Sequence, residues 1–446
     1  MGRDANDIVR QEGPGALRGR LDGAIMAIPA TNAVGASRAK PNWHFDLIKG
    51  EDDGRPRDCL ANGSLILRKD PAFDGRLVFD EHRGRPMCRD MPWDRGSNWR
   101  EWTNTDDLRL AEWVQLQGVI LRPTTCADAL QAVTDDLHCH PIREFLGKLQ
   151  WDGIKRLDRW LADYLSAQPN ELTGEFGYRF LISAVARIFK PGCKADCALV
   201  LEGKQGAGKS TALASLVPNP EWFADEISDL GSKDAAQDLR GKWIVEIAEL
   251  SALRRGEIER VKAFMSRSVD HYRPSYGRRS QDFPRQCVFA GTTNADTYLA
   301  DETGNRRFWP VRVGEIDIPG LVGVRDQLWA EAVTAFHRGE QWWLPAEVDV
   351  LAAREQEKRL IVDPWQDLVV EWASKQADDV TIRQILCQLL EVPIERQDQT
   401  HQNRVSRILR AAGYERRQVR RDGTRNWVYV KPSPVVTTPH GETGDK

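Results

Sequence analysis

The chain contains a segment that fits the pattern G-x-x-x-x-G-K-[ST] at every fixed position, residues 203–210 with the sequence GKQGAGKS. An apolar run at 198–201 precedes this segment, and a helical sequence at 211–216 follows it. In a strand–loop–helix unit of this kind, glycines let consecutive backbone N–H groups turn inward around phosphate oxygens, and the helix N-terminus adds positive potential. The segment therefore predicts an α/β core with a nucleotide-binding loop. A chance glycine-rich turn, the alternative, would not explain the flanking strand and helix.

The side chains of this loop have distinct predicted roles. Lys209 would reach the β- and γ-phosphates of ATP, and Ser210 would coordinate a magnesium ion. ATP and magnesium are therefore the expected cofactors. The residues expected to contact the nucleotide are Gly203, Lys204, Gln205, Gly206, Ala207, Gly208, Lys209, Ser210 and Thr211.

A second apolar run, residues 243–249, carries two carboxylates and is typical of a buried strand. In parallel sheets of this type, an acid at the carboxyl end of a strand holds magnesium through water or polarises the attacking water. Glu249, at the end of the run, is the better candidate for that work. Glu246 lies inside the run, where an unpaired carboxylate is costly, and would assist at the metal. The alternative is that both acids belong to an edge strand without a catalytic role.

A third strand is predicted at 287–291, followed by polar residues. Asn294 has both a donor and an acceptor, so it could hold the attacking water and sense the γ-phosphate. The segment 304–311 then places Arg306 and Arg307 between a glycine turn and an apolar strand. Either arginine could supply a planar, permanently charged finger to a γ-phosphate. The alternative is a salt-bridged surface pair.

The chain resembles the virulence-associated protein E family, which is related to the superfamily 3 helicases. The resemblance covers roughly residues 59–345 and implies a P-loop NTPase core with a central, mostly parallel sheet of the AAA+ or superfamily 3 helicase type. It also implies replication of a phage or other mobile genetic element, by a DNA helicase or initiation motor. A homo-oligomeric ring is expected because an arginine finger generally acts on the nucleotide of the next subunit. The segments that carry the resemblance are 203–210, 243–249, 287–294 and 304–311, flanked by 140–153, 191–196 and 272–276.

Two features depart from the family pattern. The first 58 residues show no pair of acids of the kind that primases place at a strand end, so a separate primase would supply any primer. The second strand ends in Ala248-Glu249 where many helicases have two acids, so the division of roles between Glu246 and Glu249 stays open. Which of Arg306 and Arg307 is the finger stays open as well.

The interval between the second and third core strands is a candidate contact for nucleic acid. Residues 267–285 contain five arginines and two aspartates, a net charge of +3. Guanidinium groups can bind phosphates while tyrosine rings stack on bases, which suits a single strand, and superfamily 3 helicases carry a pore-facing hairpin here. The alternatives are that Arg267 and Arg273 reach a neighbouring subunit's nucleotide, or that the charge is only surface charge. The candidates are Arg267, Tyr272, Arg273, Tyr276, Arg278 and Arg279.

The segment 376–432 predicts a small winged-helix-like domain. Apolar residues at helical spacing define two helices around 382–389 and 405–412, and Asp422-Gly423 then joins two strands. Residues 404–431 contain nine basic and two acidic side chains, a net charge of +7, which favours contact with duplex phosphates over a protein–protein module. The candidate contacts are Arg404, Arg407, Arg420 and Arg421.

The remaining organisation follows from composition and pattern. The 446 residues have a net charge of −3 and no apolar stretch long enough for a membrane span, and the eight scattered cysteines indicate reduced thiols and a cytoplasmic location. The family resemblance implies that this is the cytoplasm of a bacterial host. In the N-terminal region we expect a strand at 63–67 and a hairpin at 77–85. The expected parts are a flexible arm (1–45), an N-terminal mixed α+β region (46–165), the ATPase core (166–345), a helical connector (346–375), the winged-helix-like domain (376–432) and a polar tail (433–446).

Together these features predict a nucleic-acid-dependent ATPase that binds single-stranded DNA through its core and duplex DNA at its C-terminal domain. Two other classes remain open. One is an ATP-binding DNA-binding switch or anti-phage protein without helicase activity. The other is a small-molecule P-loop kinase, which the Asn294 strand and the basic C-terminal segment fit poorly.

Overall fold

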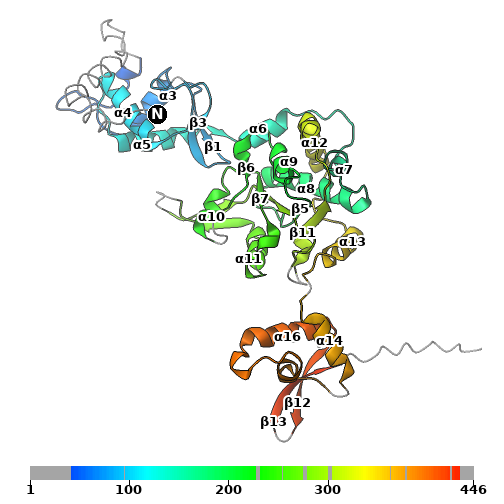
Figure 1. The fold of residues 1–446 in the computed structure, drawn as a ribbon. Helices are drawn as coiled ribbons and strands as arrows, with labels where there is room; N and C mark the ends of the chain where they lie inside the picture. Colours follow the sequence, from blue (N-terminus) through cyan, green and yellow to red (C-terminus); the bar gives the residue numbers. More distant parts are fainter. Residues whose placement is uncertain are drawn as a thin grey trace, which may run out of the picture. The chain divides into compact units, whose positions relative to one another are not determined.

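The computed structural model of the chain describes residues 42–94, 96–227, 232–253, 255–274, 279–299, 304–361, 363–376, 379–421 and 424–431 (Figure 1). This described part divides into two compact units, one that ends at Cys139 and one that begins at His140. Most of the expected arm at 1–45 and the whole expected tail at 433–446 lie outside the described residues. None of the helices within the described residues is both long and apolar enough to span a bilayer.

The first unit packs helices against a four-stranded sheet with the order β3-β2-β1-β4. Strands β1 and β2 pair antiparallel, which confirms the hairpin expected at 77–85, and β1 pairs parallel to β4. The elements are η1 (Asn42–Phe45), α3 (Leu60–Lys69), β1 (Leu77–Asp80), β2 (Arg85–Cys88), β3 (Arg100–Glu101), α4 (Asn104–Leu116), α5 (Pro123–Thr134) and β4 (His138–Cys139).

The segment 63–67, expected to be a strand, lies inside helix α3, so that prediction was wrong. A Cβ added to Gly63 would lie 2.7 Å from the Cβ of Ala129, so the missing side chain is what lets α3 approach α5 closely. Ile66 and Leu67 of the same helix are buried in the core of the unit. This close helix contact outweighs the strand propensity of the Leu-Ile-Leu run, because propensity in an apolar segment yields to packing.

A buried carboxylate, Asp106, ties the start of α4 to neighbouring segments. It accepts hydrogen bonds from the Arg100 guanidinium at 2.7 and 2.8 Å and from the Trp93 indole at 2.9 Å. The backbone N–H of Thr103 donates a further bond at 2.8 Å. Burial by itself raises the pKa of Asp106, but these hydrogen bonds more than offset it and hold that pKa well below its usual range. Asp106 is therefore ionised in the folded unit.

The second unit is built on a five-stranded sheet in which each strand runs parallel to its neighbours, in the order β11-β5-β10-β7-β6. This sheet confirms the expected α/β core with a central parallel sheet. Side chains alternate between two layers: Leu199 and Leu201 pack on one face, and Ala198 and Val200 pack on the other. The strands are β5 (Ala198–Glu202), β6 (Phe223–Ala224), β7 (Ile244–Ile247), β10 (Val288–Thr293) and β11 (Phe308–Arg312).

Helices cover both faces of this sheet (Figure 1). Residues 141–165, expected in the N-terminal region, form α6 and α7 and pack in the hydrophobic layer of α8 and α12. At the other end, Gln356 of α13 donates a 2.9 Å hydrogen bond to the carbonyl of Phe308 in β11. The body built on the sheet thus extends beyond the expected core of 166–345 at both ends. The helices are α6 (Pro141–Lys148), α7 (Trp160–Leu165), α8 (Glu171–Phe189), α9 (Lys209–Ser215), α10 (Lys233–Asp238), α11 (Arg255–Met265), α12 (Ile318–His337) and α13 (Ala346–Glu357), with the short turns η2 (Pro220–Trp222), η3 (Leu250–Ala252) and η4 (Asn305–Arg307).

Residues 363–431 have a small hydrophobic core that includes Val369, Leu409 and Tyr429. The order of helices followed by an antiparallel hairpin agrees with the expected outline, while the winged-helix assignment and its DNA contact stay predictions. The elements are α14 (Gln366–Lys375), α15 (Ile382–Gln384), the π-helical turn η5 (Ile385–Leu389), η6 (Ile394–Arg396), α16 (Gln399–Ala411), β12 (Glu415–Arg421) and β13 (Thr424–Val430).

Candidate nucleotide-binding site

The glycine-rich loop lies at the carboxyl edge of the parallel sheet, between β5 and α9. The backbone N–H of Gly203 donates a 3.2 Å hydrogen bond to the carbonyl of Thr293 at the end of β10, and α9 begins at Lys209. Gly206 and Gly208 have φ values of 77° and 84°, which side chains disfavour, so the path of the loop depends on these glycines. The strand, loop and helix therefore follow one another as the sequence predicts.

The ammonium group of Lys209 is held on the inside of the loop. Its Nζ donates hydrogen bonds to the carbonyls of Gly203 at 2.9 Å and Lys204 at 2.8 Å, and to Oδ1 of Asn294 at 2.8 Å. Burial lowers the pKa of Lys209, and the nearby Glu246 carboxylate offsets part of that lowering. The two groups expected to act on a γ-phosphate, Lys209 and Asn294, are therefore in direct contact.

Glu246 of β7 is the buried acceptor beside the loop. Its Oε1 accepts hydrogen bonds from the hydroxyls of Ser210 at 2.7 Å and Thr292 at 2.6 Å. Its Oε2 is buried and has no hydrogen-bond partner among the described residues, and such an orphaned oxygen is costly. Magnesium is bound by one or two carboxylates together with phosphate oxygens, so the pair Ser210 and Glu246 fits that ion.

Glu249, expected to be the better candidate for activating water, lies just past the end of β7. Its φ is 50°, in the left-handed region, and the residue is exposed. Within the described residues no hydrogen bond or ion pair holds its carboxylate, whereas that of Glu246 is fixed by two hydroxyls. The two acids, whose division of roles the sequence leaves open, thus have different surroundings, one held beside Ser210 and the other open to solvent.

A buried ion pair supports the strand that leads into the loop. Arg359 donates to the two carboxylate oxygens of Glu202 at 2.5 and 2.8 Å, and the hydroxyl of Tyr298 donates to the same carboxylate at 2.9 Å. Burial, with this carboxylate alongside, raises the pKa of Tyr298. The sequence gives no signal for this contact, because Glu202 and Arg359 are 157 residues apart.

The paired arginines lie at the opposite edge of the sheet from the loop. Strands β11 and β5 are parallel, with Phe308 beside Ala198 and Arg312 beside Glu202. Arg306 and Arg307 therefore lie at the amino end of these strands, and the glycine-rich loop lies at the carboxyl end. Strands of this length span about 16 Å, which is longer than an arginine side chain. Neither arginine can reach the loop of its own chain.

The two arginines differ in their contacts. Nε of Arg307 lies 3.4 Å from Oδ2 of Asp196, and both side chains are largely buried. Across the described residues, the guanidinium of Arg306 makes no ion pair or side-chain hydrogen bond, and Arg306 is exposed. Sequence reasoning missed Asp196 as a partner, although it lies two residues before β5, the strand beside β11.

The candidate nucleic-acid segment forms the expected hairpin, with β8 (Val269–Tyr272) paired antiparallel to β9 (Gln281–Pro284). Arg285 anchors its base, donating to both carboxylate oxygens of Asp270 at 2.6 and 2.8 Å, and both side chains are buried. Tyr272 is buried with its ring 4.5 Å from that of Phe283, so it does not offer a face for a base, contrary to expectation. The exposed candidates are Arg267, Arg273 and Arg279, while Tyr276 and Arg278 lie outside the described residues.

The arginines of the C-terminal part fall into two groups. Arg404 donates to Asp363 at 2.7 Å and lies 3.8 Å over the Trp365 ring, and Arg407 donates to the same carboxylate at 3.1 Å. Both are therefore already engaged within this part of the chain.

Arg420 is exposed on β12, and the side chain of Arg421 lies outside the described residues. Sequence reasoning missed Trp427 on the same hairpin, which is half exposed with the Arg416 guanidinium 4.1 Å over its ring.

Comparison with known proteins gives a family match and a set of similar structures that includes three of one protein region. Residues 146–361 match the model of the virulence-associated protein E-like domain. No curated protein matches the chain. Three apo structures of the NrS-1 C-terminal region each cover 79% of this chain, with 14%, 14% and 13% identity and TM-scores of 0.40, 0.41 and 0.42. The matches span 95%, 96% and 87% of those chains, and a likeness of this level carries no conclusion about function.

Proposed function

We propose, from the match of residues 146–361 to the virulence-associated protein E-like domain, that the chain is a nucleic-acid-dependent ATPase. As the family resemblance implies, it would be a DNA helicase or replication-initiation motor of a phage or other mobile genetic element. The observation that carries the proposal is the cluster at the carboxyl edge of the sheet, where Lys209 contacts Asn294 and Ser210 contacts Glu246. These are the groups that phosphoryl transfer to water requires.

Each group of the cluster has a proposed role. The loop backbone would bind the phosphates, and Lys209 would exchange its carbonyl contacts for β- and γ-phosphate oxygens. Ser210 and Glu246 would hold magnesium, which supplies positive charge against the triphosphate. Asn294 would position the attacking water, and Glu249, whose carboxylate is exposed beyond β7, would accept its proton.

The finger would come from a neighbouring subunit. Arg306 and Arg307 lie at the sheet edge away from their own loop, so an arginine can complete a site only in a second copy of the chain. Arg306 is the better candidate, because Arg307 is already paired with Asp196. A closed ring in which each chain serves the next satisfies this requirement, since a head-to-tail contact closes by rotation.

Nucleic acid would bind at two places. The exposed Arg273 and Arg279 flank the tip of the β8–β9 hairpin and would contact the phosphates of a single strand. Arg420, with the Arg416–Trp427 pair on the same hairpin, would contact a duplex at the C-terminal part. A separate primase would supply primers, and the motor would act in the cytoplasm of the host.

The competing functions differ in how DNA affects ATP hydrolysis and in whether hydrolysis separates DNA strands. A small-molecule kinase would hydrolyse or transfer phosphate without regard to DNA, and a switch protein would bind ATP and DNA without separating strands. The decisive experiment incubates the full chain with ATP, magnesium and a forked duplex whose displaced strand is labelled. Strand release that requires ATP supports the motor. DNA-stimulated hydrolysis without strand release favours the switch.

A further inference from the structure

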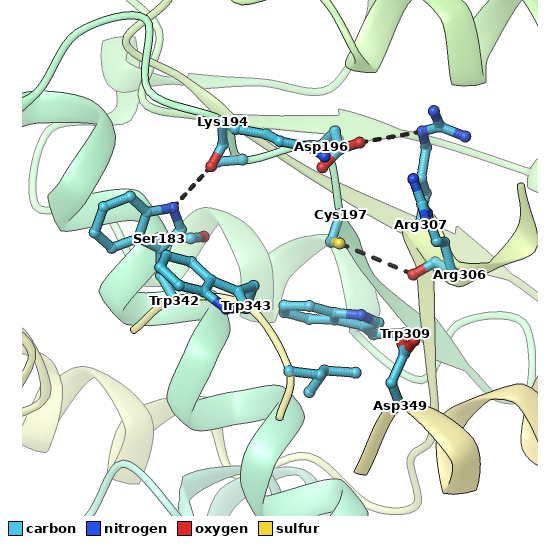
Figure 2. A pocket seen from close by; sticks show the side chains of 12 residues that line it. Ser183, Lys194, Asp196, Cys197, Arg306, Arg307, Trp309, Trp342, Trp343 and Asp349 are labelled. Atoms are coloured by element: carbon cyan, nitrogen blue, oxygen red, sulfur yellow. Dashed lines mark hydrogen bonds and ion pairs between the residues drawn. The ribbon is translucent and has the colours of Figure 1, made fainter. Parts of the chain in front are cut away.

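A pocket of about 480 Å³ opens at the amino edge of the parallel sheet, beside Arg306 and Arg307. Figure 2 shows its lining, with Trp309 in the middle, Trp342 and Trp343 to one side, and Arg306 to the other. Its volume lies in the range of small-molecule sites. Because β5 and β11 separate this edge from the glycine-rich loop, a ligand here would not be the nucleotide of the same chain's loop.

The floor of the pocket has a donor without an acceptor. Trp309 is 2% exposed, and its ring stacks on Phe176 with centroids 5.6 Å apart and planes 4° apart. Its indole Nε1–H is buried and has no hydrogen-bond partner among the residues that the structure describes. A buried unmatched N–H is costly, so the site favours a ligand that brings an acceptor to it.

The walls of the pocket are aromatic. Trp342 is fixed by a 2.7 Å hydrogen bond from its Nε1 to the carbonyl of Lys194, and it meets Trp343 edge to face at 5.2 Å. Trp343 is 55% exposed, an unusual degree for a tryptophan in a pocket. A flat ring with acceptor atoms can stack on such a surface.

The charged side chains that line the pocket are more often positive than negative: Lys194, Arg306 and Arg307 stand against Asp196 and the exposed Asp349. Lys194 and Arg306 are both exposed, and in the described residues neither side chain has an ion-pair partner, whereas Arg307 is neutralised by Asp196. The Cys197 thiol is not a reactive group here, because burial raises its pKa to about 12. The pocket therefore suits an anion bound without covalent chemistry.

We propose that this pocket binds one nucleotide unit, with its base against Trp343 and near the Trp309 N–H, and its phosphate between Lys194 and Arg306. A nucleobase is flat and rich in acceptors, and base–aromatic stacking beside a cation is how single nucleotides are commonly held. The unit could be a free mononucleotide or the terminal nucleotide of a single strand. Either occupant would contact Arg306 and so couple the pocket to the proposed finger.

The test uses AMP, in a full chain carrying Lys209→Ala so that the glycine-rich loop is impaired, with binding followed by NMR titration. Trp343→Ala is expected to weaken AMP binding about tenfold through lost stacking. Trp309→Phe keeps an aromatic ring, although a smaller one, but removes the N–H, and it is expected to weaken AMP binding about fivefold. Lys194→Ala is expected to weaken AMP and to reduce the salt dependence of binding. Trp99→Ala is the control, an exposed tryptophan of the first unit that is expected to change nothing.

A competition experiment identifies the source of the nucleotide. If a short 5′-phosphorylated oligothymidylate displaces AMP, the pocket takes the end of a strand, and if it does not, the pocket takes a free nucleotide. The proposal is overturned if AMP does not bind, or if it binds equally to folded Trp309→Phe and Trp343→Ala. The Trp309 N–H would then be satisfied by water or by a neighbouring subunit. Neither result bears on ATP binding at the loop, which is measured separately in the chain with Lys209 intact.

Discussion

The hydroxyl of Ser210 donates a 2.7 Å hydrogen bond to Oε1 of Glu246, and this contact joins the start of α9 to the strand that carries the two acids. It brings the predicted magnesium ligand of the loop to a carboxylate whose other oxygen has no partner within the described residues. Glu249 lies three residues further on, exposed and unpaired in the same described part. The roles of the two acids can therefore be separated by experiment.

Glu246→Gln and Glu249→Gln are expected to fail at different steps. Glu246→Gln removes a negative charge beside Ser210 and should raise the magnesium concentration needed for ATP binding. Glu249→Gln should leave ATP binding intact and slow single-turnover hydrolysis by about 100-fold or more, the usual effect of losing a general base. Magnesium titrations of ATP binding and single-turnover rates distinguish the two. Equal ATP binding and equal rates in the two variants would contradict the division of roles.

Arg306→Ala is expected to abolish ATP turnover and to be rescued by mixing with Lys209→Ala. The first variant keeps the loop and the second keeps the finger, so about a quarter of the interfaces in randomly mixed rings would be complete. The measurement is phosphate release after mixing, with energy transfer between labelled subunits as the control for exchange. Subunits that exchange without any recovery of activity would rule out a finger supplied by the neighbour.

Arg273→Ala and Arg279→Ala are expected to weaken binding of single-stranded DNA without affecting the fold, because both side chains are exposed at the hairpin. Each lost phosphate contact should reduce the slope of log affinity against log salt by about 0.7. Tyr272→Ala should instead destabilise the hairpin, because this ring packs against Phe283 in the interior. Anisotropy titrations at several salt concentrations, with thermal melts alongside, test this. A Tyr272 variant that melts normally and loses DNA binding would reverse the assignment.

Acidification is expected to destabilise the first unit through Asp106. Hydrogen bonds hold the pKa of this carboxyl below its unfolded value of about 3.9, so its stabilisation is full above that pH and is lost as pH falls below it. Asp106→Asn should cost about 2 kcal/mol at neutral pH, because it removes a charged acceptor from Arg100 and Trp93, while Arg100 keeps its contact with Asp94. It should also flatten the acid limb of the stability curve. Hydrogen exchange within residues 42–139 reports on this unit, and Glu101→Gln, in an exposed ion pair with Arg85, is the control.

Much of the site could be predicted because its functional residues lie in short segments with recognisable residue types and spacing. The loop at 203–210 needs glycine at the two positions with positive φ, and Lys209 and Asn294 each follow directly from the residue types that phosphate contacts demand. The parallel sheet was predictable for a similar reason, since buried parallel strands are continuously apolar.

The remaining features depend on contacts that a linear sequence does not display. Asp196 and Arg307 are far apart in the chain, and only the pairing of β5 with β11 brings them together. Tyr272 was misjudged because a count of arginine and tyrosine ignores strand alternation, which turns Asp270 and Tyr272 inward and His271 outward. The local run at 63–67 favours a strand, but this segment is part of helix α3, because Gly63 lets the helix lie close to Ala129.

The most direct measurement of the central claim is the rate of phosphate release from ATP and magnesium, with and without single-stranded DNA. The intact chain is expected to hydrolyse ATP and to do so faster with DNA. In Lys209→Ala the rate of phosphate release should fall by about 100-fold or more, while the fold is kept because the site lies on a loop. Lys148 is an exposed lysine of α6, and the rate in Lys148→Ala should match that of the intact chain. Turnover that persists in folded Lys209→Ala, or that ignores DNA in the intact chain, would contradict a DNA-dependent ATPase at this loop.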